Sequence, residues 1–87
     1  MIRKLQMSLS EAQEKGITKW PVWEKEVSEF DWHYDNEEHF YLVEGEVIVS
    51  CQNEKYHLNP GDYVVMRKGI DTHWKVIKPV YKHYIMY

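Results

Sequence analysis

The chain has 87 residues, enough for one small domain, and 44% of them are hydrophobic and 15% aromatic. Large side chains of this kind are what a core of this size needs. The net charge is −3 and no long basic run occurs, which argues against a nucleic-acid-binding groove. Cys51 is the single cysteine, so an internal disulfide and a cysteine-rich zinc site are excluded.

Targeting signals are not visible in the sequence. The first seven residues lack an apolar stretch long enough for a signal peptide, and no segment approaches the length of a transmembrane helix. With one unpaired cysteine, this pattern predicts a cytoplasmic protein with no membrane partner.

A short helix is expected near the N-terminus. Ser8 and Glu11 have the spacing of a capping box, and Gly16 is a natural helix stop. These signals predict a helix at about 9–15, too short to be stable unless it docks on the rest of the domain. The candidate docking residues are Leu5, Leu9 and Ile17.

After Gly16 the pattern changes to an alternation with a period of two residues. Phe30, Trp32 and Tyr34 alternate with polar residues, which predicts a half-buried strand with its aromatic side chains inward. Further strands are expected at 38–43, 47–51, 56–58, 63–66, 74–77 and 80–87. Turn residues separate them at 35–36, 44–45, 52–54, 59–62 and 68–71, and Pro79 divides the last two. Short strands at this spacing predict an all-β sandwich or barrel.

Four residues have the spacing of a two-part cupin motif: Glu38, Gly45, Gly61 and Gly69. Further supporting segments are 20–24, 30–32, 41–45, 60–62 and 74–84. On these residues the chain resembles a small single-domain cupin of the group named after (S)-ureidoglycine aminohydrolase. The resemblance implies one cupin domain over residues 1–87, folded as a double-stranded β-helix (a jelly-roll barrel) with a pocket between its sheets.

The resemblance also raises the question of a metal. The family's three histidine ligands and one glutamate correspond here to Trp32, Tyr34, Thr72 and Glu38. Tryptophan cannot ligate a metal, and neutral tyrosine and threonine are poor ligands. On this alignment no metal cofactor is expected.

A register shifted by one residue gives the alternative. It would present Asp31, His33, Glu38 and His73, a set able to hold iron, manganese or zinc. The shift would expose the aromatic side chains of residues 30–34 and forfeit on the order of 5–9 kcal/mol. The alternation at 72–76, which places Thr72 and Trp74 inside, agrees with the unshifted register.

The unshifted register predicts an aromatic pocket with one carboxylate, that of Glu38. Its candidate ligand-binding residues are Trp32, Tyr34, Glu38, Phe40, Thr72 and Trp74. An inward carboxylate is costly unless it is paired, so Glu38 serves as a ligand anchor or general base, or else as a structural ion pair or hydrogen-bond partner. No catalytic residue can be named. The other possibility is that the aromatic side chains simply fill the barrel.

Three functions are compatible with this pattern. The first is binding of a small molecule in the pocket without a metal. The second is a metal-dependent enzyme acting on a small nitrogenous or keto compound. The third is a structural module with a filled barrel that forms a homodimer through its sheet edges. Several other residues are expected to be structural: Cys51 in the core, Asp62 as a turn cap, His39, His57 and His83 as packing or surface residues, and Arg67 and Lys68 as a solvated loop pair.

Overall fold

The structure is a computed structural model that describes residues 2–87. Over these residues the chain forms seven strands, one α-helix and one 3-10 helix. Their bounds are β1 (Ile2–Gln6), α1 (Leu9–Glu14), η1 (Ile17–Lys19), β2 (Val22–Lys25), β3 (Ser28–His33), β4 (Glu38–Cys51), β5 (Glu54–Leu58), β6 (Asp62–Met66) and β7 (Asp71–Met86).

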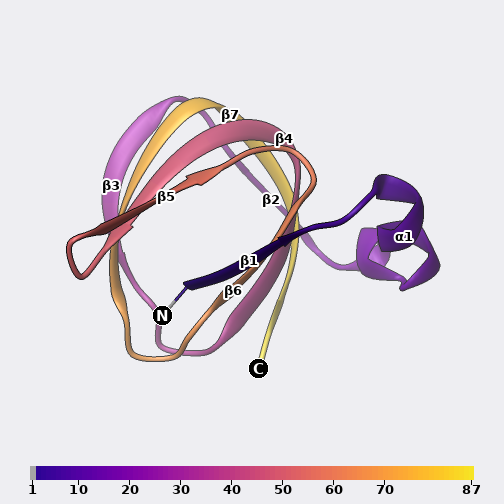
Figure 1. The fold of residues 1–87 in the computed structure, drawn as a ribbon, viewed down its shortest axis with the longest axis horizontal. Helices are drawn as coiled ribbons and strands as arrows, with labels where there is room; N and C mark the ends of the chain where they lie inside the picture. The colour runs from indigo at the N-terminus through magenta and orange to yellow at the C-terminus, as the bar shows by residue number, and fades with distance from the viewer. Residues whose placement is uncertain (1) are drawn as a thin grey trace.

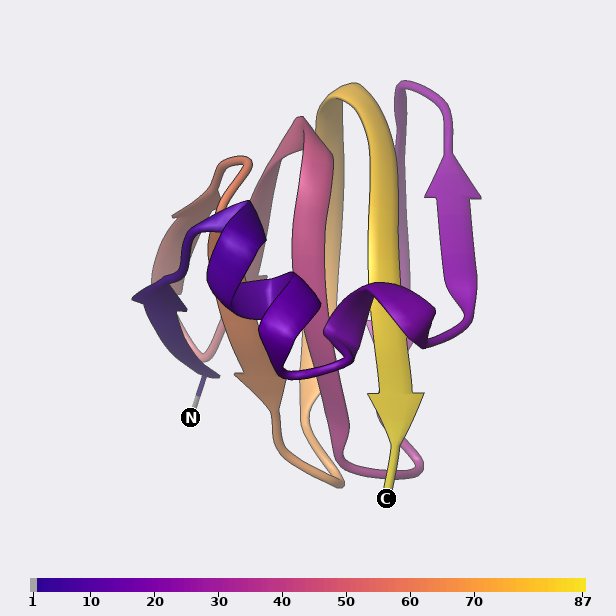
Figure 2. The same cartoon turned by 90° about the vertical axis from the view of Figure 1, so that its right-hand side faces the viewer.

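The strands pair antiparallel and curve around one interior. The order is β1-β6-β4-β7-β2, with β3 also paired to β7 and β5 to β4. The view along the interior in Figure 1 shows the strands as a ring with α1 outside it, and the side view in Figure 2 shows the helical segment crossing the outer surface. The predicted all-β barrel with a short N-terminal helix is confirmed.

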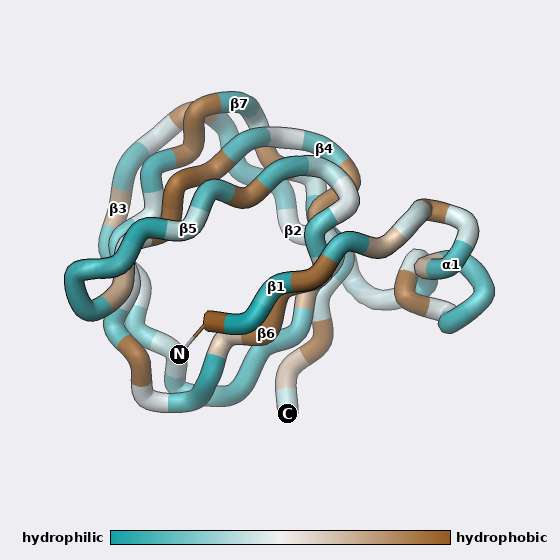
Figure 3. Tube along the Cα trace, viewed as in Figure 1, coloured by the Kyte–Doolittle hydropathy of each residue, from teal (hydrophilic) through white to brown (hydrophobic). Residues whose placement is uncertain are grey.

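The interior is filled by alternate residues of the long strands. Phe40, Leu42, Val47 and Val49 of β4 are at most 1% exposed, and they join buried residues of β6 and β7 in one cluster. Figure 3 shows the underlying alternation of hydrophobic and hydrophilic residues along the strands. Cys51 is buried in this cluster, as predicted.

The two long strands differ from the prediction. β4 continues through the expected turn at 44–45, and β7 continues through Pro79. Instead of turning, β4 bends, with register shifts against β7 between Leu42 and Val47. Gly45 makes the bend possible: its φ is +112°, and a Cβ there would lie 2.7 Å from the Pro79 carbonyl oxygen. The glycine marks a close approach of two strands rather than a chain reversal.

β1 and β2 have no counterpart among the predicted strands. β1 lies at one end of the sheet order, and four of its five residues are exposed. β2 lies at the other end and buries none of its residues fully. Strands of this kind show no clean alternation of apolar and polar residues, which is the signal that prediction requires.

The helical segment docks on the outside of the sheet. The Ser8 hydroxyl accepts a hydrogen bond from the Glu11 amide at 3.1 Å, which confirms the predicted N-cap. Ile17 is buried as expected, with Met7, Ala12 and Tyr41 as its partners in a second cluster. Leu5 and Leu9 are 53% and 48% exposed, so these two docking predictions were wrong. The small Ala12 side chain makes the close contact instead.

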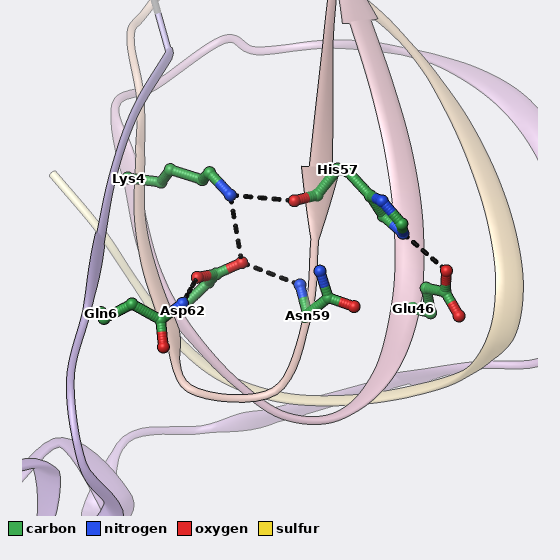
Figure 4. Close-up of polar contacts among 6 residues, drawn as sticks. All are labelled: Lys4, Gln6, Glu46, His57, Asn59 and Asp62. Atoms are coloured by element: carbon green, nitrogen blue, oxygen red, sulfur yellow. Dashed lines mark hydrogen bonds and ion pairs between the residues drawn. The ribbon is translucent and has the colours of Figure 1, made fainter.

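Asp62 caps the turn before β6, as predicted. Its carboxylate accepts from the Asn59 amide at 2.8 Å and from Gln6 Nε2, and Lys4 Nζ lies 3.7 Å away (Figure 4). Lys4 Nζ also donates to the His57 carbonyl at 3.0 Å. The buried Asp62 therefore ties β1 to β5 and β6.

Candidate functional site

A buried ion pair lies inside the barrel. Glu38, the first residue of β4, is 3% exposed, and its Oε2 accepts a hydrogen bond from Lys82 Nζ at 2.6 Å. Lys82 comes from β7 and is 5% exposed. The register pairs Glu38 with Met86 and Leu42 with Lys82, so the lysine reaches along the interior to the carboxylate. Each charge would be costly to bury without the other.

Aromatic rings surround the ammonium group. Lys82 Nζ lies 4.1 Å from the ring centroid of Phe40, 4.7 Å from that of Trp23 and 5.0 Å from that of Trp74. These distances allow cation–π attraction from three sides. Burial lowers the pKa of Lys82, and the charge and hydrogen bond of Glu38 oppose that shift.

The ion pair faces a cavity of about 210 Å³. This volume is below the roughly 300–1,000 Å³ typical of sites for drug-sized molecules, so a compact ligand fits it. Phe30 and Trp74 stack with an interplanar angle of 14° along one wall. The lining residues are Trp23, Phe30, Trp32, Tyr34, Glu38, Trp74, Lys82, Tyr84 and Met86.

Two polar groups in the cavity remain available to a ligand. Tyr34 is 2% exposed, and burial, followed by the Glu38 carboxylate, raises the pKa of its hydroxyl. The hydroxyl therefore stays protonated and can donate. Trp74 Nε1 faces this hydroxyl and, as a hydrogen-bond donor, opposes the rise, but the contact falls short of full hydrogen-bond geometry. A buried donor without a partner costs about 1–3 kcal/mol.

Four of the six predicted pocket residues line this cavity: Trp32, Tyr34, Glu38 and Trp74. Phe40 does not, because it is fully buried beneath Lys82. Thr72 does not either: it borders the separate, wider hollow described below, and its hydroxyl donates to the Trp32 carbonyl at 2.8 Å. Trp32 is 50% exposed and stands at the rim, whereas the alternation predicted it inside.

A wider hollow of about 920 Å³ lies elsewhere, around the turn between β4 and β5. It is bordered mainly by polar residues of that turn and by β3 and β7 residues such as His33 and Asp71. It does not include Glu38 or Lys82. We take the smaller cavity as the candidate site because only there do aromatic walls and buried polar groups converge.

Comparison with known proteins identifies the fold family. The family described as EutQ-like cupin domain matches residues 12–84. The chain belongs to this cupin family. The broader part of the predicted resemblance is therefore confirmed, while the ureidoglycine aminohydrolase group stays a prediction.

Several solved structures are similar to this cupin. A DUF861-family protein from Thermotoga maritima is 42% identical over the whole of both chains, with a TM-score of 0.92. A putative ethanolamine utilization protein Q (EutQ) from Salmonella typhimurium is 18% identical, with a TM-score of 0.69 over 99% of this chain and 67% of that one. The Clostridium difficile EutQ protein has the same identity and coverage and a TM-score of 0.70. No curated protein matches.

The residues at the family's ligand positions do not fit a metal. Of Trp32, Tyr34, Thr72 and Glu38, only Glu38 offers a carboxylate, and that carboxylate already accepts from the Lys82 ammonium. A divalent cation there would lie beside a buried positive charge, with no imidazole to complete its coordination.

The shifted metal set is not assembled. Asp31 and His73 face each other on the exposed surface of β3 and β7, 2.7 Å apart, and His33 contacts Asp71 there at 2.7 Å. Glu38 lies inside the barrel. Over residues 2–87, no group of three or more His, Cys, Asp or Glu side chains could hold a metal ion. Strand alternation separates the set, because successive side chains point to opposite faces.

Sequence analysis missed Lys82 as a residue of the candidate site, together with the cavity-lining Trp23, Phe30, Tyr84 and Met86. A signal was present. Thr72, Trp74, Val76, Val80 and Lys82 are all buried and all even-numbered. Continuing this alternation through Pro79 would have placed Lys82 inside. The sequence analysis instead expected the strand to end at the proline, and the alternation was not carried further.

The remaining histidines have local partners. His39 lies 2.8 Å from both the Tyr63 hydroxyl and Glu37. His57 contacts Glu46 at 2.6 Å, and His83 lies 3.0 Å from the Trp20 carbonyl. None of the three lines the cavity. Arg67 and Lys68 are exposed, as expected of a loop pair. Within the described part of the chain, no helix is long and apolar enough to span a bilayer.

Proposed function

We propose that this cupin binds a compact, uncharged organic molecule in the barrel cavity, without a metal. The molecule has an apolar body and one hydrogen-bond acceptor. The observation that carries the proposal is an open aromatic cavity containing a buried donor, Trp74 Nε1, whose contact with the Tyr34 hydroxyl falls short of a full hydrogen bond.

The charge balance of the cavity supports an uncharged ligand. Glu38 and Lys82 neutralise each other at 2.6 Å. An anionic ligand would be repelled by Glu38 at close range, and a cationic ligand would be repelled by Lys82. Aromatic side chains form most of the remaining lining and would contact an apolar body. An acceptor such as a carbonyl oxygen would satisfy Trp74 Nε1 and relieve the cost of burying it unpaired.

The proposal is tested with acetophenone and ethylbenzene, which are similar in shape and differ in the carbonyl oxygen. Calorimetry and tryptophan fluorescence should show binding of both, with acetophenone the tighter ligand. Trp74→Phe keeps an aromatic ring and removes the donor. It should weaken acetophenone binding about tenfold, the equivalent of roughly 1.4 kcal/mol, and leave ethylbenzene binding nearly unchanged.

The matched control is Trp20→Phe, because Trp20 packs against Tyr63 outside the cavity. It should leave both affinities unchanged. The proposal is wrong if neither compound binds to the wild type. The role of the indole donor is wrong if Trp74→Phe binds acetophenone as tightly as the wild type does.

A further inference from the structure

Lys82 lines the cavity, and its ammonium is enclosed by one carboxylate and three aromatic rings. One side of the ammonium is held by Glu38 at 2.6 Å. Three further directions are covered by the rings of Phe40, Trp23 and Trp74. A molecule in the cavity would therefore contact Lys82 and Glu38 together.

We propose that Lys82 is a nucleophilic amine that forms an imine with an aldehyde or ketone bound in the cavity, with Glu38 as its proton acceptor. This inference rests on the proposed function, because the carbonyl compound must first enter the same cavity. It adds a covalent reaction and a substrate class to that function.

The first step requires a neutral amine, and the geometry supplies a route to it. Nζ and Glu38 Oε2 are within hydrogen-bond distance, the arrangement expected of a nucleophile and its base. Proton transfer from Lys82 to Glu38 converts two buried charges into two neutral groups, which a low-polarity environment favours. Burial also lowers the pKa of Lys82, in the direction that such a lysine needs.

The reaction balances without another reagent. The Nζ lone pair forms a bond to the carbonyl carbon, and the carbonyl π electrons move to oxygen. One proton then passes from the nitrogen to that oxygen to give a neutral carbinolamine, while Glu38 keeps the proton that it took from the ammonium. Loss of that hydroxyl as water, with the proton returned from Glu38, leaves a protonated imine on Lys82. The sum is one lysine ammonium and one carbonyl compound converted to one iminium and one water.

Two groups in the cavity can donate hydrogen bonds to the carbonyl oxygen as negative charge develops on it. Trp74 Nε1 is buried without a full hydrogen bond, and the Tyr34 hydroxyl stays protonated because burial raises its pKa. Donors placed at a developing oxyanion lower the barrier to addition.

The experiment uses benzaldehyde and sodium cyanoborohydride at pH 7, followed by intact-mass measurement and peptide mapping. Cyanoborohydride reduces the imine to a stable benzyl amine. The expected result is one benzyl group per chain, on Lys82, labelled at least tenfold faster than exposed lysines such as Lys55 and Lys78 in the same sample. Those lysines are internal controls, so the test does not depend on a variant that might not fold.

Glu38→Gln tests the proton acceptor. It should slow labelling of Lys82 at least tenfold while labelling of Lys55 stays unchanged, with circular dichroism confirming the fold. Equal labelling in Glu38→Gln would overturn the role of Glu38.

Binding of benzaldehyde is measured separately by tryptophan fluorescence without reductant. Binding without a Lys82 adduct would overturn the imine and leave the proposed function intact. Absence of binding would overturn both. Labelling of the exposed lysines with Lys82 unmodified would show that the buried pair is only structural.

Discussion

At the scale of single residues, the buried pair of Glu38 and Lys82 is the centre of the candidate site. Both side chains are at most 6% exposed, and removing either partner leaves a charge in an apolar interior. Breaking such a pair costs about 3–5 kcal/mol, whereas replacing both partners by apolar residues of similar volume is often neutral or stabilising.

A double-mutant cycle tests this asymmetry. Glu38→Leu and Lys82→Met should each lower the free energy of unfolding by about 3–5 kcal/mol, and the double variant should lie within about 1 kcal/mol of the wild type or above it. Urea denaturation measures all four proteins. Additive losses in the double variant would show that the two side chains are not coupled.

On the outer face, His73 gives a pH-dependent contribution to stability. Hydrogen bonds to Asp31 and then to Glu29 raise the pKa of His73 above 6.5, and the bond to His73 lowers the pKa of Glu29 below 4.5. The stabilisation from protonated His73 is complete below pH 6.5 and is lost as the pH rises through the folded-state pKa. The contribution of Glu29 is present above pH 4.5 and is lost as the pH falls through its lowered pKa.

Melting temperatures from pH 4 to 9 should therefore fall more steeply above pH 6.5 in the wild type than in His73→Gln. The effect should be small, and 0.5 M salt should reduce it, because the three side chains are solvent-exposed. Identical profiles for the two proteins would contradict a role for this ion-pair cluster.

At the scale of secondary-structure elements, the long strands β4 and β7 position the site. Glu38 lies at one end of β4, and Lys82 lies in the C-terminal half of β7. β4 bends at Gly45, where the two strands approach each other closely. The Pro79 carbonyl of β7 occupies the space that a side chain at position 45 would need.

Gly45→Ala should therefore be more destabilising than an alanine at an open glycine. We expect a loss of about 2–5 kcal/mol, the sum of backbone strain at positive φ and of overpacking against Pro79. The matched control is Gly69→Ala, which has a φ of +91° but no atom within 4 Å of the added Cβ. Similar losses in the two variants, measured by urea denaturation, would exclude the contact with Pro79 as the cause.

At the scale of the whole molecule, the helical segment and the barrel are joined through a second, smaller cluster. Tyr41 faces outward from β4, and its buried hydroxyl donates to the Met7 carbonyl at 2.9 Å. This bond fixes the start of the helical segment to the central strand of the sheet. The homodimer expected through the sheet edges stays a prediction, which light scattering would test.

Tyr41→Phe should lower stability by about 0.5–1.5 kcal/mol and speed amide hydrogen exchange in α1 more than in β4. The Ala12 amide, which bonds to the Ser8 carbonyl at 3.0 Å, is a suitable reporter. Tyr56→Phe is the control, because its hydroxyl donates to Glu54 at an exposed site and Tyr56 lies outside the cluster that docks the helical segment. Uniform acceleration across the chain would indicate global destabilisation instead.

Local patterns predicted much of this architecture. The N-cap at Ser8 and the turn cap at Asp62 depend on neighbours within a few residues, whereas the inward position of Glu38 was predicted from the family resemblance. The bend at Gly45 and the exposure of Leu9 could not be predicted in this way. Each depends on segments far away in the chain: β7 for the glycine, and the outer face of the sheet for the helix.

By itself, the sequence determined the buried face of the strands that show a clean alternation, with Trp32 as an exception, because side chains alternate whatever the strand's partner is. That alternation places His33 and His73 outside and Tyr34, Glu38 and Trp74 inside. Only the tertiary structure decided what Glu38 contacts. Lys82 is 44 residues away, and the pairing of β4 with β7 passes through irregularities that no local pattern specifies. The partner of a buried charge is set by register and curvature, and these follow from the packing of the whole barrel.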